Sequence, residues 1–172
     1  ARLPSAHDAE TTARLAHAVA ALHHKLLADK KEPSRFWPVR VGDMFSRLLE
    51  RDAALGEALL VAPNFGLPEH ALFAERLPAA LQPAAARAML RALAKTAPAP
   101  SATPELIDFL AVLPDADLFP ALRPLWAQTS LQDALTRRFA RTPQPEDRAR
   151  FLAALASFQP AVVELAARAL GQ

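Results

Sequence analysis

The sequence predicts an all-α protein, specifically an α-solenoid (superhelix) of stacked antiparallel helix hairpins. Apolar residues recur at the three- and four-residue spacing of helices along most of the chain, and the alternation typical of strands is nearly absent. The 172 residues include 16 Pro but only 4 Gly, a balance that suits short helices with sharply marked ends. Short amphipathic helices joined by short loops pack as antiparallel hairpins, and successive hairpins stack side by side.

The first 62 residues are expected to form an N-terminal helical segment (1–62) without a recognisable motif. Its first helix should run from about Asp8 to Asp29, with Ser5 and Asp8 spaced as capping residues. Four apolar residues at 4-3-4 spacing predict the buried face of this helix: Leu15, Val19, Leu22 and Leu26. A second and a third helix are predicted within 39–60, with a break near Asp52.

Residues 63–172 are expected to form helical repeats. Thr103-Pro104-Glu105 is the clearest helix start, because it combines a capping hydroxyl, Pro in the first turn and an acid at the positive end of the helix dipole. Pro120 and Pro124 should bend or fray the helix that contains them. The predicted helices are 68–77, 83–95, one from Thr103 to about 112, 116–127, 130–141, 145–157 and 161–171.

Residues 151–172 carry the clearest repeat signal. One helix ends at Ser157, a Phe-Gln-Pro turn follows, and the next helix has an apolar stripe in which small Ala side chains let neighbouring helices approach closely. The stripe consists of Val162, Leu165, Ala166, Ala169 and Leu170. This stretch resembles the HEAT-repeat family, including its short bacterial variety, at Pro160, Val162, Ala166, Ala167, Ala169, Leu170 and Gly171. It departs from the family at Ser157-Phe158-Gln159, where an acid is usual, and at Val163, where Arg is usual.

The resemblance implies a scaffold that binds another protein, or a neighbouring domain, on a concave helical surface and has no catalytic activity. HEAT-like DNA glycosylases use a scaffold of this sort, so a DNA-binding or DNA-repair module stays open as an alternative. A structural spacer within a larger multidomain enzyme is a third alternative, since such arrays also occur inside large bacterial proteins. Two earlier segments, 68–95 and 104–126, match the repeat pattern more loosely.

Basic residues are the main candidates for contact with a partner. Arg87, Arg91 and Lys95 recur at four-residue steps and would form a cationic ridge able to track phosphates. A second basic cluster is formed by Arg137, Arg138 and Arg141. The net charge of +2 is a weak signal for nucleic acid, and aromatic residues for base stacking are not interleaved with these arginines. A protein partner is therefore favoured over nucleic acid.

Three acidic residues precede Arg by four positions, the spacing of ion pairs on a solvated helix face. These pairs are Asp133–Arg137, Glu146–Arg150 and Glu164–Arg168. Trp37 follows a charged loop, so it is a candidate binding anchor, although packing of that loop onto the helices is favoured. Trp126 lies on an apolar stripe and is expected in the core.

The histidines do not have the spacing of a metal site. His17, His23 and His24 include no i, i+4 pair, and they are expected to be solvated. His7 and His70 have no partner nearby in the sequence. We therefore expect no metal ligand among them.

Catalytic patterns are missing as well. The sequence has no GxSxG elbow and no Gly-rich phosphate loop, and the absence of Cys excludes disulfides, thiolate metal sites and Cys nucleophiles. Asp115 and Asp117 precede a helix, where capping explains them. We expect no catalytic residue and no cofactor. We also expect a soluble chain without a transmembrane helix or signal peptide, and the sequence identifies no compartment.

Overall fold

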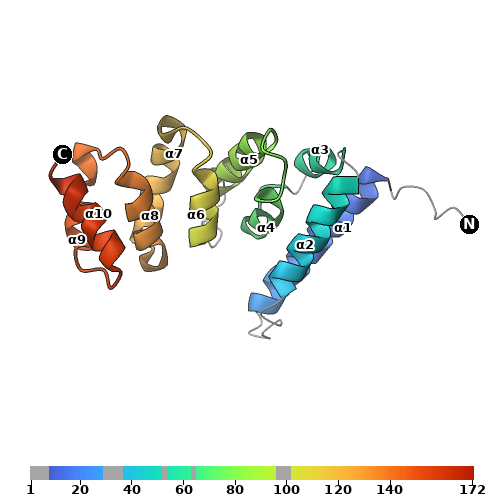
Figure 1. Ribbon diagram of the computed structural model, residues 1–172, viewed down its shortest axis with the longest axis horizontal. Helices are drawn as coiled ribbons and strands as arrows, with labels where there is room; N and C mark the ends of the chain where they lie inside the picture. Colours follow the sequence, from blue (N-terminus) through green and yellow to red (C-terminus); the bar gives the residue numbers. More distant parts are fainter. Residues whose placement is uncertain (1–7, 29–36, 52–53, 63–64, 96–101) are drawn as a thin grey trace, which may run out of the picture. The chain divides into compact units, whose positions relative to one another are not determined.

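The computed structural model describes residues 8–28, 37–51, 54–62, 65–95 and 102–172 (Figure 1). Within these ranges the side chains of 23–28, 37–41, Glu69 and 94–95 are not described. All regular secondary structure in the described ranges is helical, which confirms the predicted all-α class. None of these helices is both long and apolar enough to cross a bilayer.

The chain divides into two compact units, residues 1–92 and 93–172. The helices that begin in unit 1 are α1 (Ala9–Ala28), α2 (Trp37–Arg51), α3 (Ala54–Val61), the 3-10 turn η1 (Pro68–His70), α4 (Ala71–Ala74) and α5 (Gln82–Lys95). Unit 2 contains α6 (Pro104–Leu110), α7 (Asp115–Leu122), η2 (Arg123–Ala127), η3 (Thr129–Leu131), α8 (Gln132–Phe139), η4 (Pro145–Asp147), α9 (Arg148–Ala154) and α10 (Pro160–Leu170). The expected boundary at 62/63 stays a prediction. Within unit 1, η1 packs with α1, and α4 packs with α2.

Most helix boundaries agree with the predicted ones. The break near Asp52 is confirmed, since α2 ends at Arg51 and α3 begins at Ala54. Thr103 caps α6 as predicted, with its hydroxyl accepting the Leu106 N–H at 3.2 Å. The predicted helix 116–127 is divided into α7, which contains Pro120, and the 3-10 turn η2. Proline at these positions lacks an N–H for the α-helical ladder, so the break has a local cause.

The buried face of α1 differs from the predicted one. Ala13, Ala16 and Ala20 are buried, whereas Leu15 and Leu22 are 57% and 51% exposed. The buried residues share a helix face at i, i+3 and i+7, and α1 packs against α3 with this face. Small side chains there let the two backbones come close, which larger leucines would prevent.

In unit 1, a second contact joins α2 to α4 and the turn that follows it. The Phe45 and Phe73 rings meet edge to face, with centroids 4.8 Å apart. Arg76 Nη1 donates to Asp43 Oδ1 at 3.2 Å and to Ser46 Oγ at 3.3 Å. A Cβ at Gly42 would overlap the Arg76 guanidinium, so a larger residue there would require the Arg76 side chain to shift.

Unit 2 is built around an aromatic core. The rings of Phe119 and Phe139 stack with centroids 4.2 Å apart, and Trp126 lies 4.7 Å from Phe139 and 6.0 Å from Phe151. Trp126 is 6% exposed, which confirms its predicted place in the core. Aromatic rings bury large apolar areas, so this cluster is a major source of the stability of unit 2.

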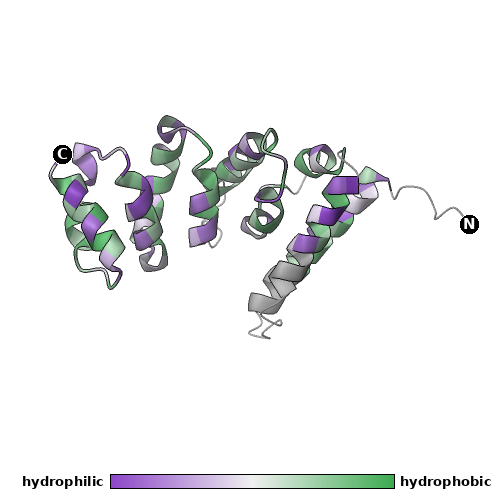
Figure 2. Ribbon diagram, in the orientation of Figure 1, coloured by the Kyte–Doolittle hydropathy of each residue, from purple (hydrophilic) through white to green (hydrophobic). Residues whose placement is uncertain are grey.

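The α9–α10 hairpin closes unit 2. Its second helix buries Val162, Ala166 and Ala169, as predicted, but leaves Leu165 and Leu170 only half-buried. Figure 2 shows that α10 carries both hydrophobic and hydrophilic residues. Phe151 is the buried residue of α9, so most of that helix faces outward.

Candidate functional site

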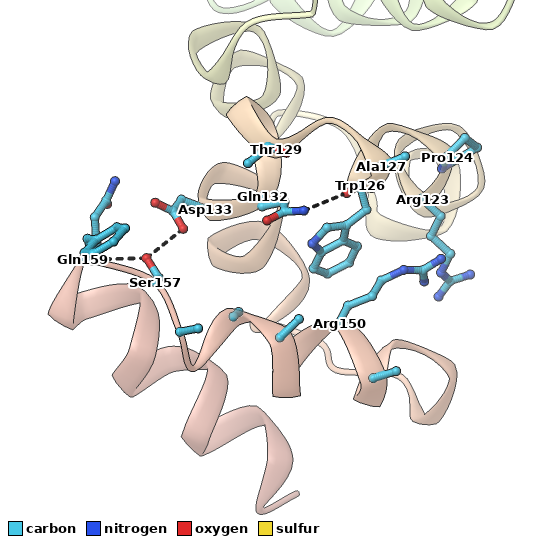
Figure 3. A pocket seen from close by; sticks show the side chains of 15 residues that line it. Arg123, Pro124, Trp126, Ala127, Thr129, Gln132, Asp133, Arg150, Ser157 and Gln159 are labelled. Carbon is cyan, nitrogen blue, oxygen red and sulfur yellow. Dashed lines mark hydrogen bonds between the residues drawn. The ribbon is translucent and has the colours of Figure 1, made fainter.

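A groove of about 850 Å³ lies in unit 2. We call it the α9 groove, and Figure 3 shows the side chains that line it. One wall comes from η2 and the segment leading into α8, and the other comes from α9 and the turn before α10. Its lining residues are Arg123, Pro124, Trp126, Ala127, Thr129, Gln132, Asp133, Ala149, Arg150, Ala153, Ala154, Ala156, Ser157, Phe158 and Gln159.

The part of the α9 groove formed by α9 is lined mainly by small apolar side chains. Ala149 and Ala153 lie one turn apart on α9 and both are exposed, so their methyl groups leave space above the helix. Phe158 lies in the turn that follows α9, and its side chain is fully exposed. Leu152 on α9 and Leu155, directly after that helix, are also exposed. An exposed apolar patch beside a groove is typical of a binding surface.

One end of the groove holds two arginines, Arg123 and Arg150, whose guanidinium groups are paired with Asp147 and Glu146. Arg123 holds Asp147 with two hydrogen bonds, from Nε to Oδ1 and from Nη2 to Oδ2, both 3.1 Å long. Arg150 Nη1 donates to the same Oδ1 at 2.6 Å, and its guanidinium lies 5.3 Å from the centre of the Trp126 ring. Asp147 itself is completely buried, and its hydrogen bond raises the pKa of the Arg123 guanidinium.

Local sequence explains how these groups meet. Pro145 opens η4, and Asp147 and Arg150 then follow at i, i+3 spacing on one side of the chain. Arg123 arrives from η2, where it also pairs with Glu146. Most of the guanidinium of Arg123 is therefore occupied within the protein, whereas the side chain of Arg150 is 36% exposed and lines the groove.

The opposite end of the groove holds a hydrogen-bonded turn (Figure 3). Ser157 Oγ donates to Asp133 Oδ1 at 2.9 Å and accepts the Gln159 N–H at 3.1 Å. Arg137 Nη1 donates to Gln159 Oε1 at 3.2 Å. These bonds fix the backbone on both sides of Phe158, so its outward position is held by the turn.

The structure corrects the predicted basic cluster at 137–141. Arg138 is buried, where it forms an ion pair with Asp115 and donates to the Leu113 carbonyl at 3.3 Å. Asp115 also accepts from the Thr142 hydroxyl, so this carboxylate ties α7 to the end of α8 instead of only capping a helix. Arg138 is therefore part of the interior and is not a surface residue for a partner.

The remaining basic candidates are scattered. Arg141 is exposed, and Arg137 is half-buried beside Gln159. Arg87 and Arg91 are both exposed on α5, as a ridge requires, but the side chain of Lys95 lies outside the described part of the chain. The side chain of Trp37 also lies outside it, so its role as an anchor stays a prediction.

Two of the three predicted helical ion pairs have other partners. Glu164–Arg168 is present at 2.7 Å. Asp133 and Arg137 instead hold the 157–159 turn, while Arg150 pairs with Asp147 in place of Glu146. Arg123, Arg150 and Phe158 were not among the predicted site residues. The fully exposed Phe158, between polar neighbours in a turn, was the one sequence signal for the groove.

The prediction that His17 is solvated is wrong, and His70, which has no partner nearby in the sequence, has one in space. His17 Nδ1 and His70 Nε2 lie 2.9 Å apart, and His70 is 2% exposed. Burial lowers the pKa of both imidazoles, and the charge of a protonated His17 helps to lower that of His70 to about 3. Among the described residues, no group of three or more His, Asp or Glu is placed to hold a metal ion. His7, His23 and His24 have no described side chain.

The α9 groove offers apolar contact, a cation and several hydrogen-bonding groups, which are means of binding. Comparison of the chain with protein-family models, with curated proteins and with solved structures finds no match.

Proposed function

We propose that the chain is a non-catalytic protein-binding module and that the α9 groove holds a segment of the partner. The fully exposed Phe158 beside an alanine-floored groove carries this proposal. Burying a Phe side chain contributes about 1.5–3 kcal/mol, so Phe158 is suited to anchor a partner. Because hydrogen bonds hold the backbone of the 157–159 turn, little backbone entropy is lost on binding.

The groove favours a partner segment with apolar side chains and a carboxylate. Apolar side chains of the partner fit over Ala149 and Ala153, because the methyl groups of these two residues leave space in the groove. A carboxylate of the partner would pair with Arg150, which lines the groove, is 36% exposed and donates a hydrogen bond to Asp147 through Nη1. Charge-assisted hydrogen bonds of this kind fix orientation as well as adding affinity.

We also propose that the α9–α10 hairpin is HEAT-like. In support, α10 begins at Pro160, buries Val162, Ala166 and Ala169, and packs against α9. Stacking of such hairpins into a solenoid stays a prediction. The DNA-binding alternative is less favoured, because Arg138 is taken up in the interior.

The test compares the full chain with groove variants in capture from the native source. Ala153→Glu places a charge and extra volume in the groove, and Phe158→Ala removes the anchor; both sites are exposed, so folding should be retained. Val112→Glu is the matched control, because Val112 is a 41% exposed apolar residue of unit 2 that does not line the groove. We expect specific partners to be lost with Ala153→Glu and weakened at least tenfold with Phe158→Ala. Retention of all partners by Ala153→Glu, with loss in Val112→Glu, would refute the proposal.

A further inference from the structure

The protons of the His17–His70 pair are fixed by its hydrogen bonds. The N–H groups of Gly66 and Leu67 both donate to His70 Nδ1, at 3.2 Å each. His70 Nδ1 is therefore unprotonated, and the proton of the neutral ring sits on Nε2. From there it is donated to Nδ1 of His17, 2.9 Å away. His17 must accept at Nδ1, so it too carries its proton on Nε2.

The pair joins two parts of unit 1 that are distant in sequence. His17 lies on α1 beside the buried alanine face, and His70 ends η1. Phe65 stacks on the His70 ring, with centroids 5.5 Å apart and planes 5° from parallel. Gly66 gives the turn a φ of +118°, which brings two successive N–H groups toward His70. The turn, the two rings and α1 thus form one connected contact.

A further proton has no place in this arrangement. On His70 Nδ1 it would point at two N–H donors, and on His17 Nδ1 it would point at His70 Nε2–H. The elements packed around the pair are α1, α3, η1, α4 and α5. The charged side chains of these helices that the structure describes are all exposed: Glu10, Arg14, Glu57, Arg87 and Arg91. Glu10 is paired with Arg14, and the side chain of Glu69 lies outside the described part.

We propose that the His17–His70 pair is an acid-sensitive latch, which fastens α1 to the rest of unit 1 and releases it when either imidazole is protonated. Burial supports this, since it lowers the pKa of both rings from 6.5, that of His70 to about 3. Once α1 is released, the imidazoles are hydrated and regain their ordinary pKa. The released state therefore takes up protons below pH 6.5 while the latched state does not, and acid favours release.

Release has a defined consequence within unit 1. The alanine face of α1 would leave α3, and the buried Leu55 and Leu59 of α3 would become accessible. Unit 2 provides an internal control, because residues 93–172 contain no histidine. Mild acid should therefore loosen unit 1 and leave unit 2 unchanged.

Hydrogen exchange of the full chain at pH 7.5 and pH 5.0 tests the latch. The exchange rates are first corrected for the effect of pH on chemical exchange. The opening constant of the α1 amides should then be roughly 30-fold larger at pH 5.0 than at pH 7.5 from the protonation of His70 alone. Amides of α8 and α10 should change less than about twofold. An α1 opening constant that is the same at both pH values would overturn the proposal.

Two variants identify the titrating groups. His70→Asn and His17→Asn keep an acceptor oxygen near the position of Nδ1 but cannot take up a proton. In His70→Asn, the increase in the α1 opening constant from pH 7.5 to pH 5.0 should be roughly 30-fold smaller than in the wild type. A rise that is unchanged in both variants would place the titration elsewhere and reject the latch.

A direct measurement on the wild type serves if these variants do not fold. Long-range ¹⁵N–¹H correlation spectra distinguish the protonation states of imidazole nitrogens. We expect His70 to remain neutral with its proton on Nε2 at pH 5.0 for as long as α1 is protected from exchange. Protonation of His70 near pH 6.5 with α1 still protected would rule the latch out.

Discussion

Asp147 provides the sharpest test of how unit 2 is held together. Its carboxylate is fully buried and accepts three hydrogen bonds from two arginines, Arg123 and Arg150. Asp147→Asn keeps the size of the side chain but removes the charge and turns an NH₂ group toward a guanidinium. Breaking a buried ion pair costs about 3–5 kcal/mol. Arg123 and Arg150 are 24% and 36% exposed and can regain hydration. We therefore expect a smaller loss of stability than this, about 2–3 kcal/mol.

Urea unfolding followed by Trp126 fluorescence measures this loss. Trp37→Phe makes Trp126, in the core of unit 2, the one tryptophan of the chain. With an m value of about 1 kcal/mol/M for a unit of this size, Asp147→Asn should lower the midpoint by about 2–3 M. The change in midpoint should persist in about 0.5 M NaCl, because the carboxylate is not exposed to screening ions.

The control for this experiment is Glu146→Gln. Glu146 pairs with the same Arg123, but its side chain is 61% exposed. We expect a loss of at most about 0.5 kcal/mol, as is usual for exposed ion pairs. If Asp147→Asn costs no more than Glu146→Gln, burial does not determine the strength of this network, and the reasoning above is refuted.

Three further predictions concern the backbone and the helix faces. Gly66→Ala should destabilise unit 1 by more than about 1 kcal/mol in urea unfolding, because φ is +118° and a Cβ would lie 3.0 Å from a carbonyl oxygen. Gly171→Ala, where a Cβ would make only ordinary van der Waals contacts, should change stability by less than about 0.5 kcal/mol. Ala16→Leu should cost about 1–3 kcal/mol by overpacking the contact of α1, whereas Leu15→Ala should cost less than about 0.5 kcal/mol; the reverse order would contradict the observed face. Thr103→Ala should cost about 1 kcal/mol by removing the cap of α6, and Thr103→Ser should restore most of it; equal losses in both variants would exclude the capping role.

Local signals in the sequence predict the elements of this fold well. Thr103-Pro104-Glu105 predicts the start of α6, and the break between α2 and α3 lies where the sequence places it. Both features depend on residues close together in the chain, such as a capping hydroxyl or a loss of periodicity. The all-helical class follows from the same local information.

The face of α1 shows where local information ends. Two stripes on this helix have helical spacing, one of leucines that includes Leu15 and Leu22 and one of alanines that includes Ala13 and Ala20. Hydrophobicity alone ranks the leucine stripe first, so the prediction chose it. The structure buries the alanines, because the distance between α1 and α3 decides which side chains fit, and that distance is a tertiary property.

The groove depends on tertiary partners as well. In the sequence, Asp147 is one of two acids near a helix start, and interaction with the helix dipole is enough to explain an acid there. Its burial depends on Arg123, which lies 24 residues away in the chain. His17 and His70, 53 residues apart, could not be paired from spacing for the same reason. Phe158 is the one groove residue whose exposure the local sequence predicts, because it lies between polar residues in a Pro-containing turn.

The alanine face of α1 leaves the axial position of that helix weakly determined. Methyl groups at 13, 16 and 20 form a nearly smooth surface, and a displacement by one helical turn would again oppose small side chains to α3. Interlocking large side chains normally prevent such sliding, but Leu15 and Leu22 are exposed. A buried polar pair can supply the missing specificity, because only one alignment satisfies its hydrogen bonds. If the proposed latch holds, the His17–His70 hydrogen bond would also select a single register for α1, and protonating either ring would permit neighbouring registers as well as detachment.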